Sequence, residues 1–250
     1  IRLGRGADGL AIATASLASF GHRATLVHAD YRRIGAVLDA LGIAQVSGVL
    51  ADFGASSMQL DVEGRGFSFR RDEPLDMRMD RTQGETAAAL IDRVDEKELA
   101  DVIYQFGEER RSRQVARAIV QARQQSRIET TGRLAEIVRR AVAARGWQRI
   151  DPATRTFQAL RIWVNGELDG LDSFIGSAVQ RLQSGGRIAL IAFHSLEDRV
   201  VKHTFRALAR PPEGGAVVKV LTKHPVIAAD AEAAANPRAR SAKLRAAERV

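Results

Sequence analysis

The order in which helical and strand-like segments follow one another constrains the fold of this chain more than any other feature. Residues 8–20 have the pattern of a helix, residues 23–29 of a β-branched strand, and residues 31–41 of a second helix. Residues 46–52 then predict a strand that ends at Asp52, just before a glycine turn. Alternation of this kind is typical of a parallel sheet with helices on its faces, so the first part of the chain predicts an α/β domain.

The strand pattern disappears between Thr86 and Arg145. Three helical stretches rich in Ala, Arg, Leu, Glu and Gln take its place, each with an apolar stripe at helical spacing. Stripes of this kind usually form a core, so the region predicts a helical insertion.

The α/β pattern returns after this insertion. A helical stretch from Thr154 to Leu182, expected to break near Asn165, leads into a buried strand over residues 187–193. Residues 195–198 then fit a capping box that opens another helix, and residues 217–221 predict a late strand.

The resulting prediction is an α/β fold built from two domains. Residues 1–75 and 150–250 are assigned to a discontinuous sheet domain, and residues 76–149 to the inserted helical domain.

Composition narrows the classes of function. A formal charge of +8 and a pI of about 10.6 favour a polyanionic partner, nucleic acid first, because Lys and Arg release counterions from phosphates. A general bias toward Arg explains the same charge equally well. No apolar run is long enough to span a bilayer and no signal segment opens the chain, so no membrane role is predicted. The absence of cysteine fits a reducing compartment, and a cytoplasmic location is expected.

Two strand ends carry polar groups, and ligands of open parallel sheets bind at such ends. Asp52 could hold an amino group by accepting its hydrogen bonds, or it could simply cap a turn. At the second end, His194 could face a cleft or merely cover the strand, and Ser195 is best explained as a helix cap rather than as a nucleophile. The five His residues show no ligand spacing, so no metal is predicted.

A competing pattern lies at the start of the chain. Gly4, Gly6 and Gly9 match the dinucleotide-binding spacing Gly-x-Gly-x-x-Gly, and Asp30 follows at the distance of a ribose-binding acid. This pattern keeps an NAD(P)-dependent oxidoreductase as a weaker alternative.

Longer motifs resemble one family. The chain is similar to the 16S ribosomal RNA cytosine-N4 methyltransferases, the RsmH (MraW) family, in nearly its whole length and in the same order. The motifs are Val49-Leu-Ala-Asp-Phe-Gly-Ala-Ser-Ser-Met-Gln-Leu-Asp61, Arg65-Gly-Phe-Ser-Phe69, Pro74-Leu-Asp-Met-Arg-Met-Asp80, Tyr104-Gln-Phe-Gly-Glu-Glu-Arg110, Ala116-Arg-Ala-Ile-Val120, Thr154-Arg-Thr-Phe-Gln-Ala-Leu-Arg-Ile-Trp-Val-Asn165, Phe193-His-Ser-Leu-Glu-Asp-Arg199 and Asn236-Pro-Arg-Ala-Arg240.

The resemblance implies a class I, Rossmann-like methyltransferase domain with an inserted helical domain that recognises the substrate. It implies S-adenosylmethionine as cofactor, with Tyr31, Asp52 and Gln59 as contacts, and a small-subunit rRNA cytidine as substrate. Asp52 occupies the position at which amino-methyltransferases hold the target amine, which makes it the candidate catalytic residue.

Two departures from the family pattern bear on the cofactor. Family members begin with a strand and a Gly-rich loop for the methionine end of the cofactor, and the resemblance implies that this chain starts after them. At the next strand end Gly4 stands where the family has a ribose-binding Asp, so Gly4 is expected to contribute only its backbone.

RNA contacts are expected from side chains that also have ordinary structural explanations. Each arginine could bind phosphate or be a solvated surface charge, and each phenylalanine could stack on a base or pack in the core. The candidates are Arg78, Arg155, Phe157, Arg161, Phe193, His194, Arg238 and Arg240. A non-catalytic RNA-binding or ribosome-assembly protein remains an alternative from another class, and a homodimer is kept as one option.

Overall fold

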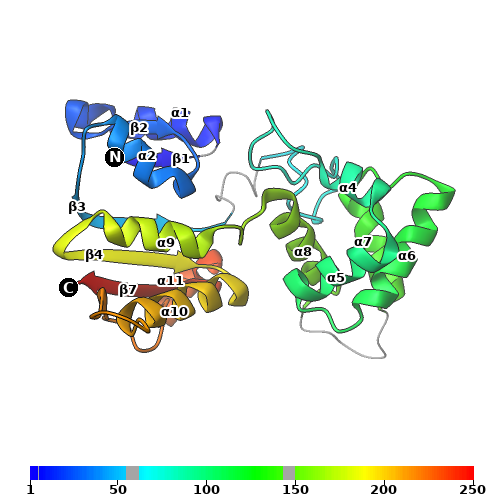
Figure 1. Cartoon of the computed structure of the whole chain (residues 1–250). Helices are drawn as coiled ribbons and strands as arrows, with labels where there is room; N and C mark the ends of the chain where they lie inside the picture. Colours follow the sequence, from blue (N-terminus) through cyan, green and yellow to red (C-terminus); the bar gives the residue numbers. More distant parts are fainter. Residues whose placement is uncertain (5, 55–61, 143–149) are drawn as a thin grey trace. The chain divides into compact units, whose positions relative to one another are not determined.

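The computed structural model describes residues 1–4, 6–54, 62–142 and 150–250 (Figure 1). The chain divides into two compact units, one of Ile1–Gly54 with Leu168–Val250 and the other of Ala55–Glu167. The second unit is longer than the predicted insertion, because its two flanks pack with the inserted helices. Pro74 forms a β-bridge with Thr130, and the helix that ends at Asn165 contacts α5 (Glu96–Gly107).

The first unit has the alternating pattern that the sequence predicts. Its elements are β1 (Arg2–Gly4), α1 (Ala7–Leu17), η1 (Ala18–Arg23), β2 (Leu26–His28), η2 (Tyr31–Arg33), α2 (Ile34–Ala40), β3 (Val46–Asp52), α9 (Leu171–Gln180), β4 (Leu182–Ala192), α10 (Ser195–Ala209), β5 (Val218–Val220), β6 (Val226–Ile227), α11 (Asp230–Ala235), η3 (Pro237–Ser241) and β7 (Lys243–Arg249). The predicted strand over residues 46–52 is confirmed at both ends.

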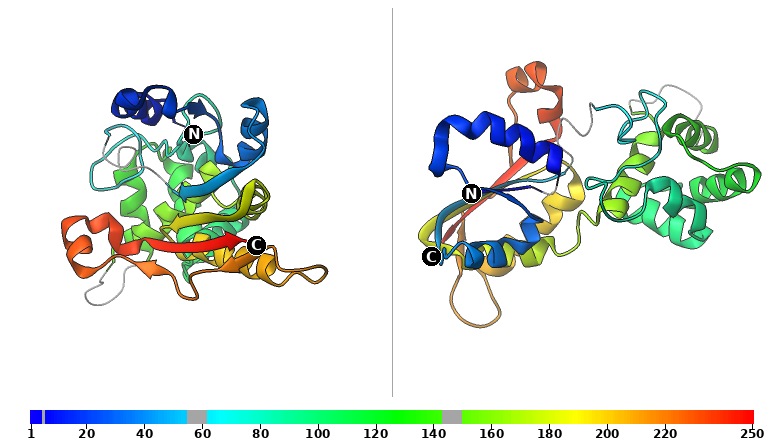
Figure 2. Two further views of the ribbon diagram at one scale, coloured as in Figure 1. Left: turned by 90° about the vertical axis from the view of Figure 1, so that its left-hand side faces the viewer. Right: turned by 90° about the horizontal axis from the view of Figure 1, so that it is seen from above.

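The strands of this unit form two sheets. β1 pairs with β2 in parallel, and a second sheet has the order β3-β4-β7-β5, with β6 also on β7. β3 and β4 are parallel, whereas β7 runs antiparallel to both of its neighbours and carries the C-terminus at its end (Figure 2). The sequence pattern predicts a parallel sheet and gives no sign of β7, because Lys-Leu-Arg-Ala-Ala-Glu-Arg contains no β-branched residue. Pairing on both edges outweighs that weak local preference.

The core of the first unit lies against the β3–β4 pair. α9 contacts α2, α10 and β4, and their apolar faces bury side chains such as Leu38, Ile175, Val179, Leu190 and Phe205. Each fully buried side chain of this size stabilises the fold by about 1.5–3 kcal/mol. These helices therefore fix the carboxyl ends of β3 and β4 against a rigid layer.

Five helices make up most of the second unit between residues 87 and 165, as far as the structure describes it. Its helices are α4 (Ala87–Arg93), α5, α6 (Ser112–Gln125), α7 (Thr131–Ala141) and α8 (Ala153–Asn165). The first of the three predicted helical stretches is in fact two helices. Thr86 caps α4 by accepting the Ala89 N–H, and Asp95 caps α5 by accepting the Glu98 N–H, so the chain turns at Val94 between them.

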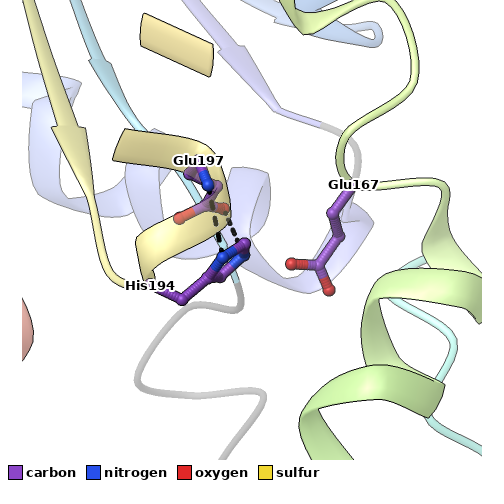
Figure 3. A group of neighbouring side chains, drawn as sticks. All are labelled: Glu167, His194 and Glu197. Carbon is purple, nitrogen blue, oxygen red and sulfur yellow. Dashed lines mark hydrogen bonds and ion pairs between the residues drawn. The ribbon is translucent and has the colours of Figure 1, made fainter. Parts of the chain in front are cut away.

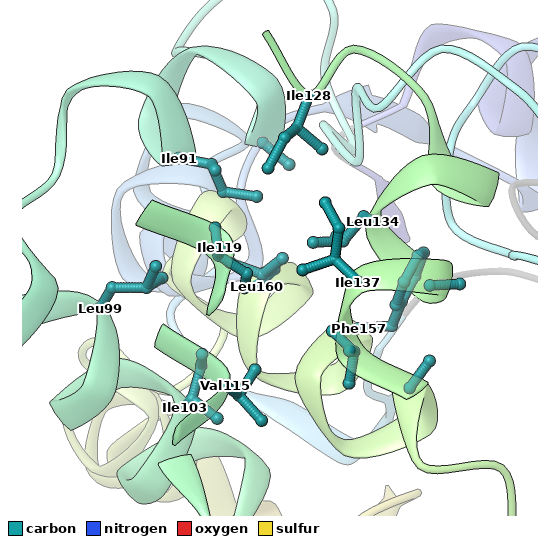
Figure 4. Close-up of a cluster of buried hydrophobic side chains, with 14 of the residues drawn as sticks. Ile91, Leu99, Ile103, Val115, Ile119, Ile128, Leu134, Ile137, Phe157 and Leu160 are labelled. Atoms are coloured by element: carbon teal, nitrogen blue, oxygen red, sulfur yellow. The ribbon is translucent and has the colours of Figure 1, made fainter. Parts of the chain in front are cut away.

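The helices of this unit enclose one apolar cluster (Figure 4). Ile103, Ile119 and Leu134 of the predicted stripes are fully buried in it, together with Leu160 of α8. Gly107 lets α5 and α8 approach closely, since a Cβ atom there would lie 2.5 Å from the carbonyl oxygen of Arg155. The predicted stripes are therefore core.

A loop before α4 is fastened to the end of α8. Asn165 donates from Nδ2 to the Met77 carbonyl at 2.8 Å and accepts the Met79 N–H at 2.7 Å. Met77 is fully buried and has a φ of 63°, a left-handed conformation that is unfavourable for a residue with a side chain. These bonds hold the loop in that conformation. Among the helices of the described ranges, none combines the length and the apolar character that a bilayer crossing needs.

Candidate active site

The carboxyl ends of β3 and β4 lie side by side. Asp52 pairs in register with Ile191, and the Phe53 N–H donates to the Ile191 carbonyl at 3.0 Å. Because the strands are parallel, the segments that follow them leave the sheet at the same edge. Phe193 and His194 follow β4 directly. The two strand ends that the sequence singled out are therefore neighbours.

Asp52 is a carboxyl whose surroundings disfavour its charge. It remains exposed, yet the protein around it removes part of its solvent, and this desolvation together with the negative charge of Glu197 raises the pKa of Asp52 above its usual value. Among the described residues no cation contributes to this shift. A carboxylate that is more basic than usual is a better acceptor for a proton from an amine.

The N-cap of the helix after β4 is His194 rather than the predicted Ser195. His194 is the N-cap of α10, and its Nδ1 accepts the N–H of Glu197 at 3.3 Å. The predicted cap was wrong by one residue, because an imidazole nitrogen replaces the expected hydroxyl as acceptor. His194 is buried, which agrees with the simpler interpretation that it covers the strand end.

Three aromatic rings lie close together near the end of β2. Tyr31 lies 4.8 Å from Phe174 and 5.7 Å from Phe53, measured between ring centroids, and stays half-buried. An aromatic ring held in this way offers part of its surface to a flat ligand such as an adenine. Its role as a cofactor contact stays a prediction.

Asp30 is engaged by Arg32. It accepts the backbone N–H of Arg32 at 2.9 Å and bonds to Nε at 3.0 Å and to Nη2 at 2.6 Å. This carboxylate caps η2 and neutralises an arginine, so it does not have the free geometry of a ribose-binding acid. A Cβ at Gly9 would meet nothing within 4 Å, so this glycine is not required for close packing either. The dinucleotide interpretation therefore loses its physical basis.

Gly4 and Gln59 are the other two predicted cofactor contacts. The Gly4 carbonyl at the end of β1 accepts the N–H of Ala29 at 3.1 Å and so continues the β1–β2 ladder. Gln59 lies outside the described residues. Both contacts stay predictions.

The arginines predicted in the helical unit are mostly paired within it. Arg78 binds Asp76 through Nε at 2.8 Å and also donates to backbone carbonyls of its own loop. Arg161 holds Glu167 with two bonds of 2.9 and 3.0 Å. Arg155 is the more available of the three, with 52% of its side chain exposed and a 3.5 Å contact to Glu109. Arg155 is therefore the best placed of these for a phosphate.

The two predicted stacking rings differ in exposure. Phe157 is buried at 4% exposure and packs edge-on against Phe69 at 4.7 Å, so its stacking role is corrected to a core role. Phe193 is half-buried at the end of β4. Of the two rings, Phe193 is the one that retains surface for a base.

The two tail arginines lie in η3 on either side of a buried residue. Arg238 and Arg240 are exposed, whereas Ala239 between them is buried and anchors the turn. They present positive charge on the sheet unit, and their RNA contacts stay predictions.

A hollow of about 350 Å³ lies elsewhere, on the helical unit beside α5. Its lining includes the carboxylates of Asp95, Glu98 and Asp101 and the rings of Phe106 and Trp163. Three carboxylates repel phosphate, so this hollow does not suit an RNA backbone.

Glu197 was not among the functional candidates that the sequence indicates. It is 1% exposed, its Oε2 accepts the N–H of Phe193 at 2.9 Å, and Figure 3 shows its contacts with His194. The sequence predicted Asp198 as the acid of the capping box, because it placed the N-cap at Ser195 instead of His194. What that pattern could not show is that the charge of Glu197 acts on Asp52.

The fold and these strand ends define a class first: a Rossmann-like methyltransferase. A model of the MraW methylase family matches residues 2–250, and the chain belongs to this family, which confirms the resemblance. The chain is 56% identical over its whole length to the ribosomal RNA small subunit methyltransferase H of Sorangium cellulosum, of which it covers 77%. It is 52% identical over 90% of its length to the protein of that name from Deinococcus deserti, of which it covers 72%.

Proposed function

We propose that this enzyme transfers a methyl group from S-adenosylmethionine to the exocyclic N4 amine of a cytidine in small-subunit ribosomal RNA. The family and the names of the relatives support a ribosomal RNA methyltransferase. The finer choice of an amine rests on one observation, the position of the Asp52 carboxylate at the carboxyl end of β3, beside the end of β4. Neither the non-catalytic alternative nor the oxidoreductase is favoured by the family match.

The residues at the strand ends fit the proposed methyl donor. Tyr31 offers a half-buried ring for an adenine, and the charges of Asp52 and Glu197 suit a cationic sulfonium. When bound, S-adenosylmethionine supplies an activated methyl group with a neutral thioether as leaving group. No metal or covalent intermediate is needed.

Asp52 would perform two tasks. The cytosine amine is a poor nucleophile because its lone pair is delocalised into the ring, so its placement in line with the methyl group matters most. Asp52 accepts a hydrogen bond from the amine and fixes that direction. As the nitrogen acquires positive charge, the carboxylate stabilises it and can take the proton.

A base inside folded RNA must be unstacked before its amine can reach Asp52. Unpaired cytidines meet this need at the lowest cost in free energy. Exposed arginines such as Arg155, Arg238 and Arg240 are proposed to bind the surrounding phosphates, and the helical unit to take part in substrate recognition.

The test is the substitution Asp52→Asn, which keeps the shape but removes the acceptor charge. We expect kcat for methyl transfer to small-subunit rRNA to fall by about 10²- to 10⁴-fold, measured at saturating S-adenosylmethionine so that weaker cofactor binding does not affect the rate. Digestion of the product RNA and mass spectrometry identify the methylated atom. An unchanged rate in the variant, or a methyl group on a ring carbon, contradicts the proposal.

A further inference from the structure

Glu197 and His194 form a closed pair in the first turn of α10 (Figure 3). Nδ1 of His194 accepts the Glu197 N–H at 3.3 Å, and Nε2 lies 3.2 Å from Oε1 of Glu197. The two side chains are 6% and 1% exposed. They are therefore shielded from solvent and face each other.

This arrangement fixes the orientation of the imidazole. Nδ1 accepts the backbone N–H of Glu197, and Nε2 is on the side of the ring that faces the carboxylate. The ring therefore holds the Glu197 side chain in place within the first turn of α10.

The surroundings of Glu197 suit a negative charge. Its Oε2 accepts the Phe193 N–H at 2.9 Å, and the residue lies in the first turn of a 15-residue helix. The positive end of the helix dipole and this N–H group offset part of the cost of burying a charge there.

The charge of Glu197 acts on Asp52. The cations Lys243 and Arg245 pair with Asp198, the next residue of the same helical turn. The Glu197 carboxylate lies at the end of β4 beside β3, because Asp52 pairs in register with Ile191 and Glu197 accepts the N–H of Phe193, two residues further along. Its charge raises the pKa of Asp52, in the same direction as the loss of solvent.

We propose that Glu197, set in place by His194 and the Phe193 N–H, is a positioning residue that keeps a fixed negative charge behind Asp52 and so strengthens Asp52 as proton acceptor. The inference rests on the proposed function, because it assigns Asp52 the task of receiving the amine proton. The same charge also favours the cationic methyl donor. Glu197 itself touches no reacting atom.

The test is Glu197→Gln, which removes the charge and keeps an oxygen that can accept the Phe193 N–H. The pH profile of kcat should have an acid limb set by Asp52, and that limb should move to lower pH in the variant. Above the limb, kcat should fall by about threefold to tenfold, because a weaker base transfers protons more slowly. A role in folding alone would lower the amount of active enzyme without moving the limb.

Two matched variants sharpen the result. Glu197→Asp keeps the charge, so its acid limb should lie close to that of the unmodified enzyme. Glu213→Gln removes an equal charge from the loop between α10 and β5, and its acid limb should not move. An unmoved limb in a folded Glu197→Gln enzyme overturns the inference.

A direct measurement covers the case in which Glu197→Gln does not fold. The carboxyl carbon of Asp52, followed by NMR across pH in the unmodified protein, should titrate above the usual range of aspartate. An ordinary titration overturns the inference and leaves the proposed function standing. Retained activity in Asp52→Asn, by contrast, overturns the proposed function itself.

Discussion

Glu197 and Asp198 are neighbours in the first turn of α10, yet their electrostatic surroundings differ. Cations bind Asp198, whereas Glu197 places a second negative charge near Asp52. On the β7 side, Arg245 binds Asp198 through Nε at 2.6 Å, and Lys243 lies 3.8 Å away. On the side of the strand ends, the charge of Glu197 opposes that of Asp52, and among the described residues no cation offsets this effect at Asp52. A carboxylate that is neutralised by cations usually stabilises the fold. A carboxyl group with a raised pKa at the ligand-binding end of a strand is a candidate for a catalytic role.

The pKa values of the two aspartates express this difference. Partial burial is the largest single influence on Asp198 and raises its pKa, but the hydrogen bond and charge of Arg245, with Lys243 and Lys202, outweigh it, and the net pKa is lowered. For Asp52, burial and Glu197 act in the same direction, and the pKa is raised. Asp76 of the helical unit behaves like Asp198: burial raises its pKa, but Arg78 and Arg81 outweigh this effect and the net pKa is lowered.

The largest effect on stability is expected from Asp198→Ala. Arg245 has only 8% of its side chain exposed, so loss of its partner leaves a buried charge without that carboxylate and should cost about 3 kcal/mol of unfolding free energy. Urea denaturation measures it. Glu248→Ala, which removes the partner of the exposed Arg187 from the same strand as Arg245, should cost at most about 0.5 kcal/mol. Equal losses would mean that the pairing of Asp198 is not special.

A smaller effect is expected from Asp76→Ala in the helical unit. Asp76 and Arg78 are 12% and 21% exposed at the side chain, and removal of the acid should cost about 1–2 kcal/mol. The exposed pair of Glu96 and Arg117 supplies the control, since Glu96→Ala should change the unfolding free energy by less than about 0.5 kcal/mol. An unchanged free energy of unfolding in Asp76→Ala would show that the Asp76–Arg78 pair does not stabilise this unit.

The contrast between these carboxyls also predicts how stability depends on pH. A lowered carboxyl pKa adds stability that is present above the usual aspartate value, about pH 4, and that is lost as pH falls through the lowered pKa. Melting temperatures should therefore change little above about pH 5 and fall as the pH is lowered from there, less steeply in Asp198→Ala. If the melting temperature falls with equal slope in both proteins, Asp198 does not contribute to the loss of stability at acidic pH.

The smallest effect has the opposite sign. Because the pKa of Asp52 is raised in the folded protein, ionisation of this residue costs folding free energy as pH rises through that raised pKa. Asp52→Asn should thus be as stable as the unmodified protein at neutral pH or slightly more so, by at most about 0.5 kcal/mol for so exposed a group. A clear loss of stability would make Asp52 a structural residue and erase the contrast with Asp198.

Local patterns were sufficient for several features. Local patterns predicted β3, the apolar stripes of the helical unit and a break near Asn165, where α8 ends and Gly166 follows with a φ of 54°. The motifs around Asp52 and His194 are enough to indicate the family, and the family match confirms it. Features of this kind depend on residues close together in the chain, so the amino-acid order carries them.

Which side chains meet could not be predicted in the same way. Arg245 and Asp198 are 47 residues apart, and no local pattern indicates that β7 enters the sheet beside β4 to bring them together. Local patterns also do not indicate that Phe157 is buried against Phe69, or that the charge of Glu197 raises the pKa of Asp52. The order of elements and the family follow from the sequence alone, because periodicity and motifs are local. Pairing, burial and the balance of charge at Asp52 arise only when distant segments pack, because they depend on distances through space.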